Sequence, residues 1–203
     1  MAKATWLKID PVSGSGNGTI DVSTDKYTGR LNRTTEFTVH SDYHLHTISV
    51  TQTGELLTNI DKGAISVDVK GGTYEITGKS NSSRLTFSID RLGDAEPIVV
   101  DSPSTYIAGG VPVDNGNSVP DGLGEYQQYT YSVTLDIPAN TDNFEKKCTL
   151  KVNNDSATHV PFVRITQAAQ EAYLRVGQTS LTLSASGTPV TLSVESNTNW
   201  TVE

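Results

Sequence analysis

The sequence predicts an all-β protein with two immunoglobulin-like β-sandwich units, one of them split between the two ends of the chain. Three observations support this fold class. Apolar residues recur at every second position, which is typical of strands with one buried and one solvated face. The length of 203 residues suits two domains of about 100 residues each. The third observation is an internal repeat that starts and ends in the middle of a unit.

One part of the repeat, the front half, occurs at residues 64–87 and again at residues 180–203. The stretch AISVDVKG of the first copy aligns without a gap with SLTLSASG of the second copy. A Ser-Asn pair follows in both copies, at residues 80–81 and 196–197. Each copy is typical of a strand, a tight glycine turn, a second strand and the start of a third.

The other part, the back half, occurs near the N-terminus and again before residue 170. Its clearest match aligns ISVTQ at residues 48–52 with VRITQ at residues 163–167. The chain therefore predicts a continuous sandwich at residues 64–170. It also predicts a split sandwich that consists of residues 1–53 plus residues 180–203.

The split unit can be completed in two ways. A half sandwich cannot bury its inner face and leaves strand edges unpaired, so each half needs a complement. The C-terminal front half either folds back onto the N-terminal back half of its own chain, or it is donated to a neighbouring subunit by strand exchange. The sequence leaves both alternatives open.

Four short motifs resemble one family of modules. SNTNW at residues 196–200 ends the front half, and WLKI at residues 6–9, SGSGNGT at residues 13–19 and VTQ at residues 50–52 belong to the back half. Together they resemble the BACON domain, the Bacteroidetes-associated carbohydrate-binding often N-terminal module. The resemblance implies an immunoglobulin-like sandwich. Such modules are typical of exported Bacteroidetes proteins, and similar ones occur in crAss-like phages of the same hosts.

The middle unit departs from the family pattern. It has Leu85 at the position of the first tryptophan, and it lacks the Ser-Gly-Ser-Gly turn. In place of that turn stands an insertion at about residues 91–126 that is rich in Gly and Pro. Because long loops without structure of their own are usually functional or disordered, we expect a flexible insertion that makes contacts.

Charge and hydropathy argue against several partners. The net charge is −8, and the chain has no Lys/Arg cluster, so we expect neither nucleic acid nor a membrane surface as a partner. The N-terminal residues lack the apolar region of a signal peptide, and the chain has no apolar run of about 20 residues. We therefore expect no signal peptide. Combined with this, the resemblance to modules of crAss-like phages implies a virion protein made in the host cytoplasm.

The motifs of catalysis and of cofactor binding are not found. No Gly-x-Ser-x-Gly elbow is present, and no nucleophile can be paired with a base. His44 and His46 with Asp42 are too few ligands to predict a metal site, and a solvated hairpin end explains them better. Cys148 lies in a strand-like stretch and is expected to be a buried hydrophobe. We expect no enzyme, no cofactor and no metal.

The insertion and the strand after it hold the candidate contact residues. The residues that we expect to contact a glycan or a protein partner are Tyr126, Gln128, Asp114 and Asn115. Tyr129 and Tyr131 share a face with the apolar residues of their strand and are expected in the core, whereas Tyr126 points the other way.

These patterns favour a structural role. Trp6 and Trp200 are expected to be core anchors of the completed split unit, because aromatic side chains bury the largest apolar areas. The leading interpretation is a non-enzymatic phage virion protein, such as a capsid decoration or fibre-base protein, that contacts capsid or neighbouring subunits. The alternative is a carbohydrate-binding module for mucin glycans.

Overall fold

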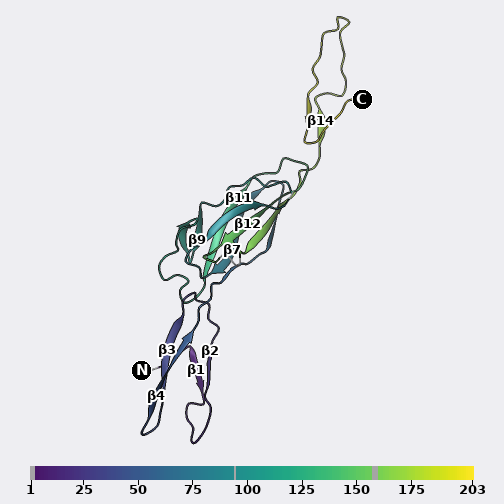
Figure 1. The fold of residues 1–203 in the computed structure, drawn as a ribbon. Coiled ribbons are helices and arrows are strands. Elements are labelled where there is room, and N and C mark those ends of the chain that lie inside the picture. The colour runs from purple at the N-terminus through teal and green to yellow at the C-terminus, as the bar shows by residue number, and fades with distance from the viewer. Residues whose placement is uncertain (1–2, 94, 157–159) are drawn as a thin grey trace.

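A computed structural model describes residues 3–93, 95–156 and 160–203, and over these residues the chain forms strands, turns and loops without a helix. The predicted all-β fold class is confirmed. Figure 1 shows three parts in line: an N-terminal pair of hairpins, a central sandwich, and a C-terminal extension. None of the described residues forms a helix that is long and apolar enough to span a membrane.

The N-terminal part consists of two antiparallel hairpins. In the first, β1 (Leu7–Asp10) pairs with β2 (Asp21–Thr24), and in the second, β3 (Arg33–His40) pairs with β4 (Leu45–Gln52). Each hairpin is a two-stranded sheet of its own. They extend side by side from one end of the central sandwich (Figure 1).

The first sheet of the central sandwich has five antiparallel strands in the order β10-β9-β11-β7-β5. Its longest pairing joins β7 to β11, from Ser80 opposite Tyr129 to Gly72 opposite Ile137. The strands are β5 (Thr58–Ile60), β7 (Gly72–Ser80), β9 (Thr105–Ala108), β10 (Val111–Asp114) and β11 (Tyr129–Ile137).

The second sheet of the sandwich has the order β6-β13-β12-β8. Its strands are β6 (Ala64–Val67), β8 (Thr86–Arg91), β12 (Lys146–Asn153) and β13 (Phe162–Gln167). The β6–β13 pair is parallel, whereas β12 is antiparallel to both of its neighbours.

The core lies between these two sheets. The ring of Phe87 in β8 lies 5.0 Å from the ring of Tyr106 and 5.7 Å from that of Tyr131, both in the first sheet. Tyr129 and Tyr131 are buried, as the alternation along β11 predicted. Cys148 is buried too, and burial raises the pKa of its thiol to about 11, so it stays protonated and packs as an apolar residue.

The insertion at residues 91–126 is structured, which corrects the expectation of a flexible loop. β9 and β10 form a hairpin within it and extend the first sheet beyond β11. Ile98 and Val119 of the insertion are buried in the core. Short strands such as TYIA and VPVD, which are bounded by Gly and Pro, give too little alternation to be distinguished from a loop.

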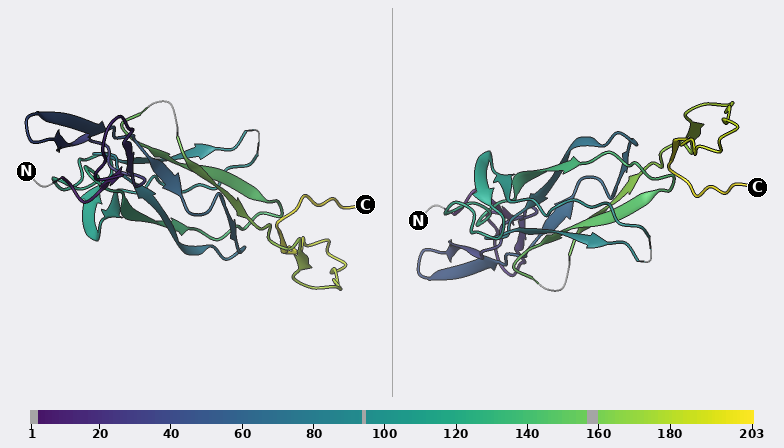
Figure 2. Two further views of the ribbon diagram at one scale, coloured as in Figure 1. Left: turned by 90° about the horizontal axis from the view of Figure 1, so that it is seen from below. Right: turned by 90° about the horizontal axis from the view of Figure 1, so that it is seen from above.

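The C-terminal part is a single long hairpin. Only its base is regular, where β14 (Leu174–Val176) pairs with β15 (Val194–Ser196). Figures 1 and 2 show this part at the end of the sandwich opposite to the N-terminal hairpins. The two segments of the predicted split unit therefore do not meet within the chain in this structure, and completion by strand exchange stays a prediction.

A substitution at Leu150 tests whether the core lies between the two sheets. Leu150 is 0% exposed and lies in β12 between β8 and β13. We expect Leu150→Ala to lower the free energy of unfolding by about 3 kcal/mol, because the substitution leaves a cavity. Leu45→Ala, where the leucine is 65% exposed, should change it by less than about 0.5 kcal/mol. Urea unfolding followed by circular dichroism measures both, and equal effects would contradict the described core.

Candidate functional site

The candidate site consists of two open half-sandwiches at opposite ends of the molecule. The N-terminal half is residues 3–53 and the C-terminal half is residues 171–203. Both expose apolar side chains that no second sheet covers, namely Ile20, Val22, Val39, Leu181, Leu183, Val190, Leu192, Trp200 and Val202. Exposed apolar surface of this extent marks an interaction site.

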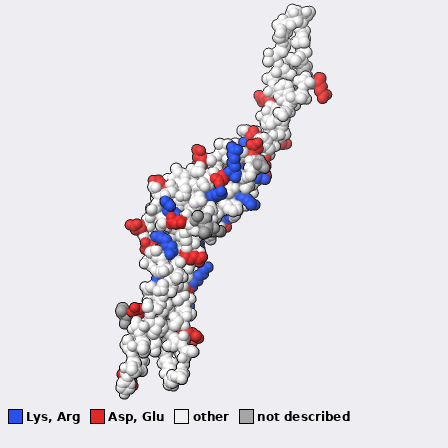
Figure 3. Space-filling view, viewed as in Figure 1, with Lys and Arg blue, Asp and Glu red and all other residues white. Residues whose placement is uncertain are grey.

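Charge is distributed unevenly between these parts. On the face in Figure 3, lysine, arginine, aspartate and glutamate gather over the central sandwich, and the two halves are mostly uncharged. The hairpin of the C-terminal half has no charged residue from 176 to 194. An interface core is normally depleted of charge, so this hairpin has the composition of one.

The C-terminal half keeps the local structure of the front half in the central sandwich. Asn197 Oδ1 accepts a hydrogen bond from the Tyr173 N–H (3.0 Å), and its Nδ2 donates to the Glu171 carbonyl (3.1 Å). Asn81 makes the same two bonds, at 2.8 and 2.7 Å. In both copies the partners lie 24 and 26 residues before the asparagine.

The glycine turns of the two front halves also match. Gly71 donates its N–H to the Asp68 carbonyl (3.0 Å) with φ of 70°, and Gly187 donates to the Ser184 carbonyl (3.1 Å) with φ of 71°. A positive φ of this size favours glycine, because side chains with a Cβ are strained there. The C-terminal half is thus a front half that lacks its complement.

The N-terminal half keeps the local structure of the back half. β3 pairs with β4 in the same register as β12 pairs with β13. Gln52 Nε2 donates to the Asp25 carbonyl (2.9 Å), just as Gln167 Nε2 donates to the Pro138 carbonyl (2.7 Å) in the sandwich. The N-terminal half is therefore a back half that lacks its complement.

The two tryptophans lie in different halves. Trp6 is half-buried in the N-terminal half, where the Arg33 guanidinium lies 4.4 Å from its ring centroid and 4.3 Å from that of Tyr27. Arg33 also donates to Gln52 Oε1. Trp200 is 51% exposed in the C-terminal half. The structure does not bring the tryptophans together, so their shared role as anchors stays a prediction.

A hydrogen-bonded joint attaches the N-terminal half to the central sandwich. The Arg30 guanidinium donates to the carbonyls of Asn81 (3.1 Å) and Leu123 (2.5 Å), and it lies 3.6 Å from a Glu125 carboxylate oxygen. The Arg30 N–H donates to the Gly124 carbonyl (3.2 Å). The end of the insertion therefore positions this half.

Close backbone packing tightens the same joint. Asn81 is 0% exposed, and besides its bond to Glu55 it donates to the Thr28 carbonyl (2.9 Å). A Cβ at Gly29 would come within 2.5 Å of the Glu125 carbonyl oxygen and of Tyr126 Cα, so only glycine fits. Sequence reasoning missed this joint because its partners are far apart in the chain.

At the other end of the sandwich, hydrogen bonds within the central unit hold the segment that leads to the C-terminal half. Asn140 is 2% exposed, and its Nδ2 donates to the carbonyls of Phe144 and Ala168, both at 2.9 Å. The Gln170 N–H donates to the Asp142 carbonyl (2.8 Å). These bonds fix where the chain leaves the sandwich.

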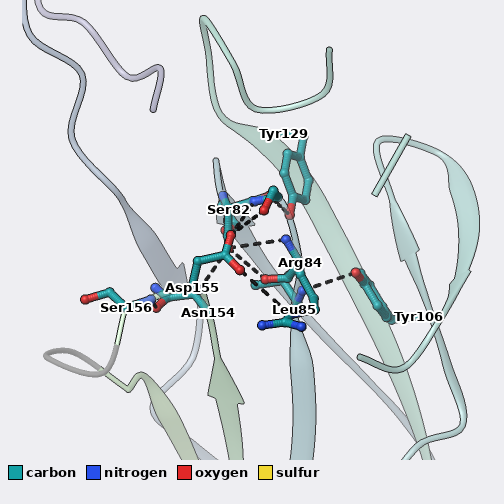
Figure 4. Close-up of polar contacts among 10 residues, drawn as sticks. Ser82, Arg84, Leu85, Tyr106, Tyr129, Asn154, Asp155 and Ser156 are labelled. Carbon is teal, nitrogen blue, oxygen red and sulfur yellow. Dashed lines mark hydrogen bonds and ion pairs between the residues drawn. The ribbon is translucent and has the colours of Figure 1, made fainter. Parts of the chain in front are cut away.

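A polar cluster around Asp155 fastens two loops of the central sandwich (Figure 4). Asp155 Oδ2 accepts hydrogen bonds from Ser82 Oγ (2.8 Å), Ser83 Oγ (2.5 Å) and the Ser83 N–H (2.9 Å), and Arg84 lies 3.8 Å from Oδ1. Partial burial would raise the pKa of Asp155, but these serine bonds and Arg84 together hold it below its usual value. The ionised carboxylate acts as a clamp between the loops that precede β8 and follow β12.

The candidate contact residues of the insertion are not gathered in one site. Tyr126 is 58% exposed, whereas Gln128 is half-buried and its N–H donates to Thr28 Oγ1 (3.3 Å). Asp114 is exposed and lines an open depression of about 420 Å³ that Tyr126 does not line. The Asn115 amide is engaged with backbone, since it accepts from the Phe87 N–H (2.7 Å) and donates to the Phe87 carbonyl (2.8 Å).

The histidine pair lies at the tip of a hairpin. His44 and His46 are exposed beside the β3–β4 turn. Over the described residues, no group of three His, Cys, Asp or Glu side chains is placed to hold a metal ion.

A known family model matches the N-terminal half. Residues 1–53 match the family model of BACON, "Putative binding domain, N-terminal", which confirms the resemblance over that range. No curated protein sequence matches the chain. A similar solved structure is the "Crystal structure of the S-layer protein SbsC domains 4 and 5", with 14% identity and a TM-score of 0.36. The similarity covers 74% of this chain and 62% of that one, so this chain spans less than two thirds of its length.

Asp155 makes stability depend on acid pH. The folded-state pKa lies below the unfolded-state value of about 3.9, so the carboxylate stabilises the fold above that pH, and the stabilisation is lost as the pH falls through the folded-state pKa. We expect Asp155→Asn to lower the unfolding free energy by about 1 kcal/mol at neutral pH, because solvent screens this partly exposed carboxylate. The difference from wild type should shrink as the pH falls below about 4.

Urea unfolding of both proteins across this pH range measures the effect. Asp121→Asn, at an exposed carboxylate of the insertion, is the matched control and should stay close to wild type throughout. A difference between wild type and Asp155→Asn that does not change with pH would refute the clamp.

Arg30→Ala tests the N-terminal joint. Loss of the guanidinium removes charge-assisted hydrogen bonds that are each worth about 1.5–3 kcal/mol. Amide exchange at Leu31 and Glu55, whose N–H groups bond across the joint, should therefore become about 10- to 100-fold faster. Arg91→Ala, at an exposed arginine of β8, is the control. Unchanged exchange at Leu31 in Arg30→Ala would show that other contacts hold the joint.

Proposed function

We propose that the protein is a non-enzymatic structural component of a phage virion, a capsid decoration or fibre-base protein that works through protein–protein contacts. The observation that carries this proposal is the pair of open half-sandwiches, with apolar faces exposed at both ends of the molecule. A protein with two such surfaces at its opposite ends is suited to link neighbours in an assembly.

The N-terminal joint supports a mechanical role. Arg30 and Asn81 bond to backbone carbonyls across the boundary between the sandwich and the N-terminal half. The N-terminal half therefore has a defined direction relative to the central sandwich, which preorganises it for a partner. The assignment to a virion rests on the resemblance to BACON modules and is a fold-level analogy.

A glycan-binding function is the second candidate. Its support is the exposed ring of Tyr126, which stands beside the exposed Gln127. The depression beside Asp114 gives weaker support for glycan binding, since it is lined by Pro, Val, Asp, Asn and Ser and by no aromatic ring. The protein-contact function is therefore favoured.

The test asks whether the protein is part of purified particles. We expect particles isolated by density gradient from infected host cultures to contain the protein at a fixed ratio to the major capsid protein, measured by quantitative mass spectrometry. Its absence from the particles would overturn the virion assignment. On a glycan array we expect no binding; submillimolar binding that Tyr126→Ala abolishes and Tyr43→Ala preserves would establish the glycan function instead.

A further inference from the structure

The two open halves are complementary parts of one sandwich. The C-terminal half repeats the hydrogen bonds of the central front half, and the N-terminal half repeats those of the central back half. In the central sandwich these two kinds of half pack directly on each other. The contacts between them therefore show what each open half lacks.

The first missing contact is the pairing of β7 with β11. There Ile76 and Val133 face each other and are 3% and 2% exposed. The equivalent residues are Leu192 in the C-terminal half and Ile20 in the N-terminal half, which are 38% and 42% exposed. The apolar residues of this seam are thus present in both halves, but uncovered.

Strand lengths identify the same missing seam. β7 and β11 have nine residues each, whereas their equivalents β15 and β2 have three and four. Residues 188–193 and 16–20, which match the paired parts of β7 and β11, belong to no strand. A strand without a neighbour loses its ladder of hydrogen bonds, so each half is irregular where the other half would pair with it.

The second missing contact is the parallel pairing of β6 with β13. In the sandwich Val67 lies opposite Gln167, and both are buried. Their equivalents are Leu183, which is 65% exposed, and Gln52, which already makes the backbone bond that Gln167 makes. The N-terminal half therefore has a prepared edge for a strand that contains Leu183.

The complement within the same chain is out of reach in this structure. The halves lie at opposite ends of the central sandwich (Figures 1 and 2), and the bonds of Arg30 and Asn81 hold the N-terminal half in its place. Closure within the chain would require one half to move along the sandwich to its opposite end. Pairing with a second copy requires no such movement.

We propose that residues 171–203 of one copy complete the half-sandwich of residues 3–53 of a second copy, with Leu192 packed opposite Ile20 and Leu183 opposite Gln52. This proposal deepens the proposed function, on which it rests, by naming the partner as another copy of this chain. The contact is head-to-tail, so it repeats from copy to copy and gives an open filament or a closed ring. The uncharged hairpin of the donated half adds no charge repulsion to this interface.

The experiment uses the 203-residue chain and two variants that each disable one half. Ile20→Asp blocks the N-terminal half and Leu192→Asp blocks the C-terminal half. In sedimentation velocity we expect wild type to form large, concentration-dependent assemblies and each variant alone to be monomeric. Mixed one to one, the variants should form a two-chain complex, because one intact half of each kind remains.

Val99→Asp is the matched control, since Val99 is 78% exposed on the central sandwich outside the proposed interface, and it should assemble as wild type does. Unchanged unfolding of the central sandwich in both half variants shows that folding is intact. Monomeric wild type, or variants that do not complement each other, would overturn the proposal. If the protein is nevertheless found in purified particles, the proposed function stands and a different protein covers the halves.

A cross-link decides between copies and a single chain. With cysteines at both Ile20 and Leu192, oxidation should give a ladder of multimers on a non-reducing gel, because the two thiols meet across the interface. A compact cross-linked monomer would show closure within the chain and contradict the proposal. Cys148 does not compete, since it is buried. The Ile20→Cys single variant, which should give no ladder, is the control.

Discussion

The pairing of β7 with β11 is the constraint on which the rest of the molecule depends. It joins a front half to a back half, and it places the apolar faces of β8, β12 and β13 over those of the first sheet. Where the seam exists, Ile76 and Val133 are buried and both strands are long. Where it is missing, at the two ends of the chain, the same kinds of residue are exposed and the strands are short. One chain thus contains the same repeat both with this strand pairing and without it.

Local hydrogen bonds survive the loss of this seam. Gly187 keeps its turn and Asn197 keeps its two backbone partners, although the C-terminal half has no second sheet. These contacts close within about 26 residues or fewer, so the loop that each must close has a modest entropic cost. Long-range strand pairing requires a partner from elsewhere in the chain or from another chain. In the open halves the turns and local hydrogen bonds are therefore already formed, and only the long-range strand pairing is missing. A partner can then bind with little rearrangement of these local contacts.

Features that recur in both copies of the repeat could be predicted from the sequence, whereas features that occur in only one copy could not. Alternation along the strands predicted the all-β class and the burial of Tyr129, Tyr131 and Cys148. The hairpin of β9 and β10 was missed because it has no counterpart in the repeat and its strands are short, with a Gly-Gly turn between them and a Pro within β10. The joint of Arg30 was missed for a different reason. Its partners are mostly backbone carbonyls, and a carbonyl leaves no signal in a sequence.

The insertion at residues 91–126 contributes both to the sheet of the central sandwich and to the joint of Arg30. Its first part widens the sheet of the central sandwich, and its last part, near Gly124, holds the N-terminal half through Arg30. A segment that would be flexible as a simple loop is therefore fastened at both sides, by the core and by the neighbouring half. Gly29 and Gly124 allow the backbones to approach closely enough for this, since a Cβ at either position would overlap a carbonyl. The direction in which the N-terminal half points is thus set by a part of the sequence outside the repeat, and a change there would alter how successive copies align without changing the faces that they share.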